Sequence, residues 1–208
     1  MKRKIELGCL IALTLMWLSL FSALMMAQGR QSFRGGQRND FDTLMMDSYR
    51  VIYSPALRIP VNVQWSLSVA DMGSSHREPS WRFQEDERVA KPRATHDDYT
   101  RSGFDRGHMV PAADRSHSIS SMKQTFLMTN VCPQVPALNR GAWKSVENAC
   151  RKVAMNGVQI RIVADAVFWP ADTLRIGRNG VAVPHGFVKT VYCSHTDSIL
   201  YSRYFQNW

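Results

Sequence analysis

Residues 104–111 read FDRGHMVP, and this stretch holds the densest chemistry of the chain. An acid, a cation, a glycine and an imidazole lie side by side at positions 105–108. His108 titrates near neutral pH and can therefore take a proton from water, and Arg106 offers a planar fork that suits phosphate. Gly107 would let the backbone turn sharply beside the imidazole. A histidine after a glycine is also common in turns and cores, so this stretch needs support from the rest of the chain.

Alternating patterns around this stretch predict a mainly antiparallel sheet. Between residues 61 and 69 every second residue is apolar (VNVQWSLSV), which is the pattern of a strand with one buried face. Residues 70–101 are polar, charged and interrupted by proline, and we expect mostly loop there. Further strands are expected at 49–53, 124–131, 158–169, 181–184, 187–193 and 199–204, with a short helix at 116–123.

Residues 142–155 form the clearest predicted helix. Apolar residues recur there at i, i+3, i+4 and i+7, and we expect this stripe to face the core: Val146, Ala149, Cys150 and Val153. Gly157 ends the pattern. Strands, a loop-rich region, one strong helix and more strands, in that order, are typical of the α+β class with a mainly antiparallel central sheet.

Two further polar clusters follow along the chain. Residues 129–134 read TNVCPQ, and residues 139–143 read NRGAW. On the expected helix, Trp143, Glu147 and Arg151 are spaced i, i+4 and i+8, so they share a stripe that differs from the apolar one. A Glu–Arg pair is also common on solvated helix surfaces, where it stabilises little, and the tryptophan most simply packs in the core. The helix alone therefore leaves a functional and a structural interpretation open.

Taken together, these motifs resemble those of the DNA/RNA non-specific endonuclease family. The DRGH sequence at 105–108, the TNVCPQ and NRGAW sequences, and Glu147 and Arg151 eight and twelve positions after Asn139 occur in the family's order and at its spacing. The resemblance covers about residues 49–200. It implies the ββα-metal (His-Me finger) fold, a form of the α+β class with one long active-site helix.

The resemblance also implies a role for four residues at the reacting phosphate. His108 would be the general base that deprotonates the attacking water. Asn139 would be the one direct protein ligand of a Mg²⁺ ion, for which Mn²⁺ is a possible substitute, and waters would fill the other positions, as Mg²⁺ prefers. Glu147 would hold metal-bound water, and Arg151 would neutralise charge on the transition state.

Four other motif residues are implied to support this chemistry. Asn130 and Gln134 would orient waters, His108 or the substrate, and Asp105 and Arg106 would shape the motif and contact phosphate. We therefore count Arg106 and Asn130 among the catalytic residues, and Asp105 and Gln134 among the substrate-binding ones.

The chain departs from the family pattern upstream of the DRGH sequence. Members place an arginine two residues before an aromatic residue and five before an aspartate. With Phe83 and Asp86 in those roles, the expected position holds Trp81. Arg82 is adjacent and Arg77 and Arg88 are near, so the residue that replaces this arginine stays open; Arg82 is predicted to bind substrate.

The implied activity is hydrolysis of phosphodiester bonds in DNA and RNA to 5′-phosphate products. Phosphate contacts carry no base information, and attack by water needs no 2′-hydroxyl, so neither base nor sugar should matter. The alternative is a non-catalytic nucleic-acid-binding or DNA-uptake module on the same scaffold. A metalloprotease would require H-E-x-x-H or a similar motif, which the chain does not contain.

The charge balance suits either function. The chain has 26 Lys+Arg against 17 Asp+Glu, a formal net charge of +9. A basic protein attracts phosphate backbones without specificity, although a basic surface can also serve solubility alone. DNA and RNA are the expected partners, and no protein partner is predicted. His117 is expected at the surface or as a helix cap rather than as a second base.

The N-terminal region reads as an export segment. Three basic residues at positions 2–4 precede a largely apolar run from 7 to 27, which fits a cleaved signal peptide or, failing that, an uncleaved membrane anchor. We expect residues 1–27 to be this segment, residues 28–47 to be a flexible lead-in and residues 48–208 to be the nuclease domain. Export would place the protein in the periplasm, outside the cell or anchored to the envelope.

Three cysteines follow the export segment. An oxidising compartment would allow one disulfide and leave one thiol. Their spacing does not resemble a zinc site, and we expect mainly small buried side chains at Cys132, Cys150 and Cys193.

Overall fold

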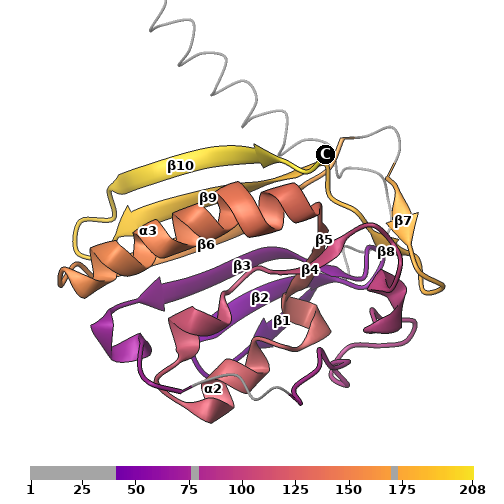
Figure 1. The fold of residues 1–208 in the computed structure, drawn as a ribbon, viewed down its shortest axis with the longest axis horizontal. Coiled ribbons are helices and arrows are strands. Elements are labelled where there is room, and N and C mark those ends of the chain that lie inside the picture. Colours follow the sequence, from indigo (N-terminus) through magenta and orange to yellow (C-terminus); the bar gives the residue numbers. More distant parts are fainter. Residues whose placement is uncertain (1–40, 76–79, 170–172) are drawn as a thin grey trace, which may run out of the picture. The chain divides into compact units, whose positions relative to one another are not determined.

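A six-stranded antiparallel sheet, in the order β1-β2-β3-β6-β9-β10, forms the frame of the protein (Figure 1). The structure, a computed structural model, describes residues 41–75, 80–169 and 173–208. The strands are β1 (Asp42–Met45), β2 (Tyr49–Ser54), β3 (Ile59–Leu67), β6 (Ile160–Val167), β9 (Gly186–Cys193) and β10 (Ile199–Gln206). The predicted α+β class with a mainly antiparallel central sheet is confirmed.

Alternation places one face of this sheet in the core. On β3, Val63, Trp65 and Leu67 are buried, while Ser66 between them is exposed. The same face continues on β6, where Ala164 lies opposite Val63 in the strand register. The strands predicted at 49–53, 61–69, 158–169, 187–193 and 199–204 are all present, because a period of two with one apolar face is a local signal.

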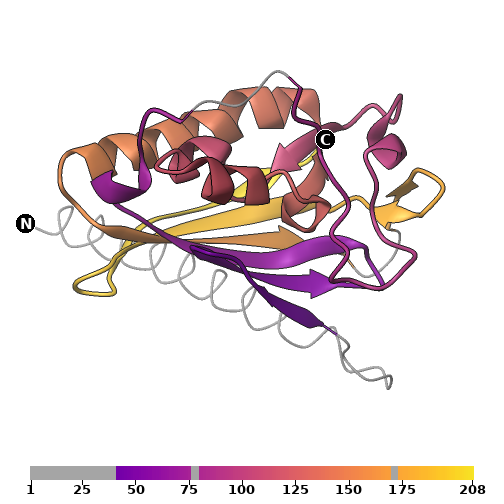
Figure 2. The ribbon, with the colours of Figure 1, turned by 90° about the horizontal axis from the view of Figure 1, so that it is seen from below.

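The helix α3 (Lys144–Met155) lies over the buried face of the sheet (Figure 2). It follows a π-helical turn from Leu138 to Trp143, in which Gly141 departs from helical dihedral angles. Helix α2 (Ile119–Gln124) is the short helix expected at 116–123, and it begins after its N-cap Ser118. Helices therefore start later than predicted where a cap or a kink precedes them.

The face that α3 buries differs from the prediction. Cys150 is buried and Val146 packs against the core as predicted, but Ala149 and Val153 are exposed, so half of the expected apolar stripe is wrong. Trp143 and Ala154 are buried beside Cys150, and the buried side of the helix therefore includes part of the predicted polar stripe. The reason is that the inward face of α3 also borders a polar cavity, where charged side chains find partners that local periodicity does not record.

A second, two-stranded sheet pairs β4 (Asp105–His108) with β5 (Val131–Gln134) in antiparallel register. The strand predicted at 124–131 is wrong, since residues 128–130 form a 3-10 turn and the strand begins only at Val131. A third small sheet joins β7 (Arg175–Ile176) to β8 (Val181–Ala182), where a strand was expected at 181–184.

The lead-in prediction fails for residues 42–45. This segment is β1, an edge strand paired with β2, and Leu44 is buried in the core. The rest of the predicted lead-in up to residue 40, and the export segment at 1–27, lie outside the described residues. Within the described ranges, no helix is long and apolar enough to span a membrane.

The cysteines are free thiols rather than disulfide partners in the described chain. Cys132 and Cys150 are buried, as expected for small apolar side chains, and Cys193 is partly buried. Burial raises the pKa of the Cys132 thiol well above its ordinary value. Cys132 and Cys150 therefore contribute packing, whereas a hydrogen bond from Thr196 lowers the pKa of the Cys193 thiol.

Candidate active site

His108 ends β4 and is held between two aromatic rings. Its ring centroid lies 5.0 Å from that of Phe83 and 5.0 Å from that of Phe126. Its backbone oxygen accepts a hydrogen bond of 3.2 Å from Trp143 Nε1 at the start of the long helix. Strand, loop and helix thus fix the position of the imidazole together, and Trp143 packs in the core as expected.

A glycine is required at position 107 because the side chain of Gln134 packs closely against its backbone, not because the chain turns there. Gly107 lies within β4 opposite Cys132, and a Cβ at this position would come within 2.3 Å of Gln134 Cδ. The predicted sharp turn beside His108 is therefore wrong. Gln134 is fully buried beneath this glycine, so it has no access to substrate, and its predicted substrate-binding role is corrected.

Asn130 is a positioning residue rather than a catalytic one. It is fully buried, and its Oδ1 accepts from Val110 N at 3.0 Å while its Nδ2 donates to Val110 O at 3.0 Å and Thr125 O at 2.9 Å. These bonds clamp the backbone two residues after His108 to the turn before β5. The prediction that Asn130 orients His108 is consistent with this position, but the amide has no atom left for the reaction.

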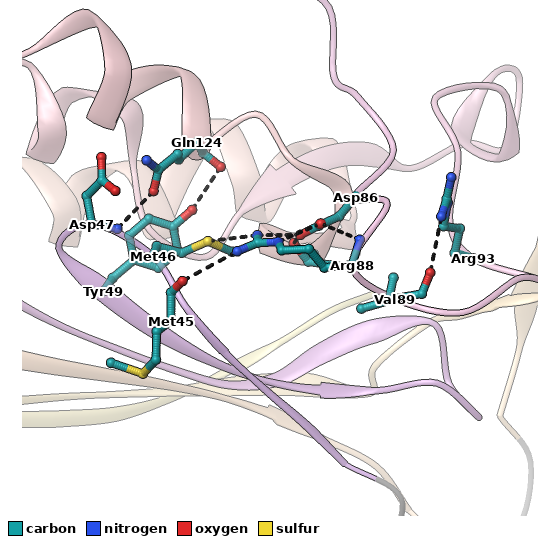
Figure 3. A network of polar contacts seen from close by, with 10 residues as sticks. Met45, Met46, Asp47, Tyr49, Asp86, Arg88, Val89, Arg93 and Gln124 are labelled. Atoms are coloured by element: carbon teal, nitrogen blue, oxygen red, sulfur yellow. Dashed lines mark hydrogen bonds and ion pairs between the residues drawn. The ribbon is translucent and has the colours of Figure 1, made fainter.

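The loop that carries Phe83 is anchored by a buried carboxylate (Figure 3). Asp86 accepts bonds from Arg88 Nε at 2.8 Å, Arg88 Nη2 at 2.6 Å and Thr129 Oγ1 at 2.7 Å. Burial opposes ionisation, but these hydrogen bonds outweigh it and lower the pKa of Asp86. Arg88 also reaches Met46 Sδ at 3.0 Å, so the anchor ties the loop both to the TNVCPQ motif and to the end of β1.

Asp105 on β4 orients the side chain of Asn139, which lies in the π-helical turn before α3. Asn139 Nδ2 donates to Asp105 Oδ2 at 2.9 Å, and the same carboxylate accepts two bonds from Arg140, at 2.8 and 2.7 Å. The hydrogen bonds from Arg140 lower the pKa of Asp105, although burial of the carboxyl group acts to raise it. An ionised carboxylate only accepts hydrogen bonds, so it faces the amide nitrogen and leaves Asn139 Oδ1 for another ligand.

The four residues implied to act on phosphate meet in one cavity. A cavity of about 390 Å³ is lined by His108, Asn139, Glu147 and Arg151, together with residues of the loop after β4. His108 and Asn139, both implied to act at the reacting phosphate, line this same cavity. Side chains from β4, the π-helical turn and α3 therefore face a common space.

Glu147 and Arg151 do not form the solvated pair that their spacing also allowed. Arg151 Nη1 bonds Asp114 Oδ1 at 2.7 Å, and Glu147 Oε1 lies 3.8 Å from Lys189 Nζ. Burial raises the pKa of Glu147 to about 7, although Lys189 opposes the shift. Asp114 is 1% exposed and also accepts from Trp65 Nε1 at 3.0 Å. Asp114 and Lys189 belong to none of the motifs, so the sequence did not predict their place at the site.

A second cavity, of about 260 Å³, shares Asn139 with the first. It is lined by Arg82, Phe83, His96, Asp105, Arg106 and Asn139. Arg106 Nη2 donates to His96 O at 2.6 Å and to Thr100 Oγ1 at 3.1 Å, which fixes its guanidinium. Asp105, Arg106 and the exposed Arg82 thus line this second cavity, and Arg106, which was predicted to be catalytic, does not line the first.

Trp81 occupies the position where the family has an arginine. Its ring packs edge-on against Phe126 at 5.8 Å, with Lys123 Nζ 5.2 Å above it. Phe126 also touches His108, so Trp81 extends the aromatic support of the imidazole. His117, by contrast, is exposed and bonds Asp71 O through Nδ1 at 3.0 Å, as expected for a surface residue.

The family model for DNA/RNA non-specific endonucleases matches residues 30–206 of the chain. The chain belongs to this family. Endonuclease G from mitochondria of Bos taurus is 36% identical over 154 residues, which are 69% of this chain and 52% of that protein. The human mitochondrial endonuclease G is 36% identical over 155 residues, 70% of this chain and 52% of that protein. A nuclease from a Nostoc species is 33% identical over 121 residues, 58% of this chain and 44% of that protein.

The endonuclease fold is also found by structural comparison. A chain from the solved EndoG/EndoGI complex matches with a TM-score of 0.72 and 24% identity, covering 88% of this chain and 80% of that one. This likeness supports the ββα-metal fold, in which β4, β5 and α3 are the ββα unit. The chain spans about half the length of the endonuclease G relatives it matches.

Proposed function

We propose that this endonuclease family member hydrolyses phosphodiester bonds of DNA and RNA without base or sugar specificity, leaving 5′-phosphates. The observation that carries the proposal is the single cavity shared by His108, Asn139, Glu147 and Arg151. A base, an amide oxygen donor, a carboxylate and a guanidinium in one space suit phosphodiester hydrolysis. A module that only bound nucleic acid would need the cations but neither the base nor the amide oxygen.

His108 acts as the general base in this proposal. The rings of Phe83 and Phe126 hold its imidazole at the cavity, and Trp143 and Asn130 hold the backbone at His108 and two residues after it. The imidazole accepts a proton from water as the water oxygen attacks phosphorus, and the 3′ oxygen leaves. A fixed base lowers the entropic cost of this geometry.

The residues present fit a hydrated divalent cation. No group of three or more His, Cys, Asp or Glu side chains that could hold a metal occurs in the described residues, so these residues do not form a metal site built mainly from carboxylates. Asn139 Oδ1 is the protein oxygen that Asp105 leaves for the ion, and Glu147 would hold one of its waters. We propose Mg²⁺, with Mn²⁺ as a substitute; when bound, the ion supplies positive charge beside the leaving oxygen.

The arginines neutralise and position the phosphates. Arg151 lines the catalytic cavity, and its bond to Asp114 fixes the guanidinium where charge develops on the transition state. Arg106 and Arg82 line the neighbouring cavity and suit the next phosphate of the strand. Because these groups read phosphate rather than base edges, cleavage is independent of sequence.

We also propose that residues 1–27 export the protein, as a cleaved signal or as an anchor. The basic start and the apolar run that follows it support this proposal. The mitochondrial location named for several relatives belongs to those proteins. Cell fractionation with an antibody against the C-terminal domain tests export, and a purely cytosolic signal would contradict it.

The test of the activity uses supercoiled plasmid and single-stranded RNA with Mg²⁺ or with EDTA. We expect both substrates to be cut with Mg²⁺ and neither with EDTA, and 5′-phosphate ends on the products. His108→Ala should abolish cutting while retaining DNA binding, and His117→Ala is the matched control because that histidine is exposed and lines neither cavity. DNA binding without cleavage by the wild type would favour the non-catalytic alternative.

A further inference from the structure

Lys189 is a lysine in the middle of the apolar face of the central sheet. It lies on β9 between Phe187 and Val191, which are buried on the same face, and its neighbours across the register are Ala164 on β6 and the exposed Arg203 on β10. Its side chain is 1% exposed. A charged side chain is almost never fully buried unless it has a partner.

The ammonium group of Lys189 is placed between aromatic rings and one carboxylate. Nζ lies 3.6 Å from the ring centroid of Trp143, 5.7 Å from that of Trp65 and 3.8 Å from Glu147 Oε1. Within the described chain, Nζ of Lys189 donates no hydrogen bond. The ring contacts offset part of the desolvation cost, and the carboxylate is its ion-pair partner.

A purely structural role explains this lysine poorly. An apolar side chain of similar volume at the same position would avoid the desolvation of an ammonium group, which costs several kcal/mol. Burial also lowers the pKa of Lys189, and Glu147 is the largest influence in the opposite direction. The lysine at position 189 is therefore explained best by Glu147, the carboxylate that it faces, and Glu147 borders the catalytic cavity.

We propose that Lys189 is a positioning residue that holds the Glu147 carboxylate, as an anion, at the wall of the catalytic cavity. Glu147 is 13% exposed and sits on α3 above the sheet, so Lys189 supports it from the side away from the substrate. The other charged groups around Glu147 are Asp114, Arg151 and Lys144. Asp114 repels the carboxylate, and Arg151 is already paired with Asp114, which leaves Lys189 as the main counter-charge. This inference rests on the proposed function for its catalytic meaning, but not for the contact itself.

The test follows the carboxyl carbon of Glu147 by NMR in protein with ¹³C-labelled glutamate, without metal or substrate. Its signal is assigned by its absence in Glu147→Gln. We expect Lys189→Met to raise the titration midpoint of Glu147, and the matched control Lys152→Met, an exposed lysine on the same helix, to leave it unchanged. An unchanged midpoint in a folded Lys189→Met protein overturns the proposal.

Kinetics test the catalytic consequence separately. With plasmid as substrate at pH 7, Lys189→Met should lower kcat by about 10- to 100-fold with a smaller change in KM, as for other residues that orient a metal's surroundings. A kcat equal to that of the wild type also overturns the proposal. If the wild type cuts neither DNA nor RNA, the proposed function fails, while the NMR result still decides the contact.

A reciprocal variant covers the case in which Lys189→Met does not fold. Coupling between two sites is mutual, so Glu147→Gln should lower the titration midpoint of the Lys189 amine in protein with ¹⁵N-labelled lysine. A Lys189 midpoint that does not move in Glu147→Gln contradicts the proposal as well.

Discussion

Replacing Gly107 by alanine tests the closest packing contact of the site. The added Cβ would lie 2.3 Å from Gln134 Cδ and 2.4 Å from its Oε1. Carbon atoms pack best at about 3.5–4.0 Å, so this contact is roughly 1 Å too short. Gln134 is fully buried and cannot swing into solvent, so its side chain must be repacked or β4 and β5 must separate.

The cost follows from that displacement. Forcing a methyl group into a packed interior costs typically about 1–3 kcal/mol of unfolding free energy. For a domain of this size, each kcal/mol lowers Tm by roughly 2–4 °C. Because His108 is the next residue, a shift of about 1 Å should also lower kcat by about 100-fold. Urea denaturation monitored by tryptophan fluorescence measures the first effect, and plasmid nicking at saturating substrate measures the second.

A double-mutant cycle isolates the contact. Gln134→Ala removes the atoms that the new Cβ would meet, so Gly107→Ala should cost less than about 0.5 kcal/mol in that background. If Gly107→Ala cost as much in the Gln134→Ala background as in the wild type, steric contact with Gln134 would not be the reason for glycine in the DRGH motif. A single Gly107→Ala protein as stable and active as the wild type would refute the reasoning outright.

Three further predictions follow from the cavity residues. Asn139→Ala should abolish the heat of Mg²⁺ binding in calorimetry, whereas His108→Ala should retain it; equal binding by both would remove Asn139 as the ligand. Since the pKa of Glu147 is raised to about 7 and its anion is the working form, kcat should fall as the pH drops through about 7, and a flat profile from pH 8 to 6 would contradict that role. Arg82→Ala, in the inactive His108→Ala background, should reduce the slope of log DNA affinity against log salt by about 1, and an unchanged slope would show that this arginine contacts no phosphate.

The motifs were predictable because they are compact along the chain. DRGH at 105–108 lies on one strand, and the NRGAW sequence leads directly into α3. The resemblance to the endonuclease family implied that these motifs act at one phosphate, and in the structure they line one cavity. Most strands of the sheet were also predictable, since alternation on one buried face is a signal carried by neighbouring residues.

The buried face of α3 was not predictable in this way. Its periodicity favours Ala149 and Val153 for the core, yet both are exposed, and Glu147 lies partly buried instead. The polar residue is accepted there because Lys189, about forty positions later on β9, supplies a counter-charge. Only packing of the helix on the sheet creates that pair.

The sequence by itself determined the α+β class, because that class depends on short-range patterns of polarity, and its resemblance to the endonuclease family predicted which residues would act on phosphate. The tertiary structure alone decided how those residues are supported: Asp114 behind Arg151, Lys189 behind Glu147, and Gln134 beneath Gly107. These partners come from separate strands and loops. The stability of a buried charge or a close contact depends on what surrounds it in space, and local sequence does not specify those surroundings.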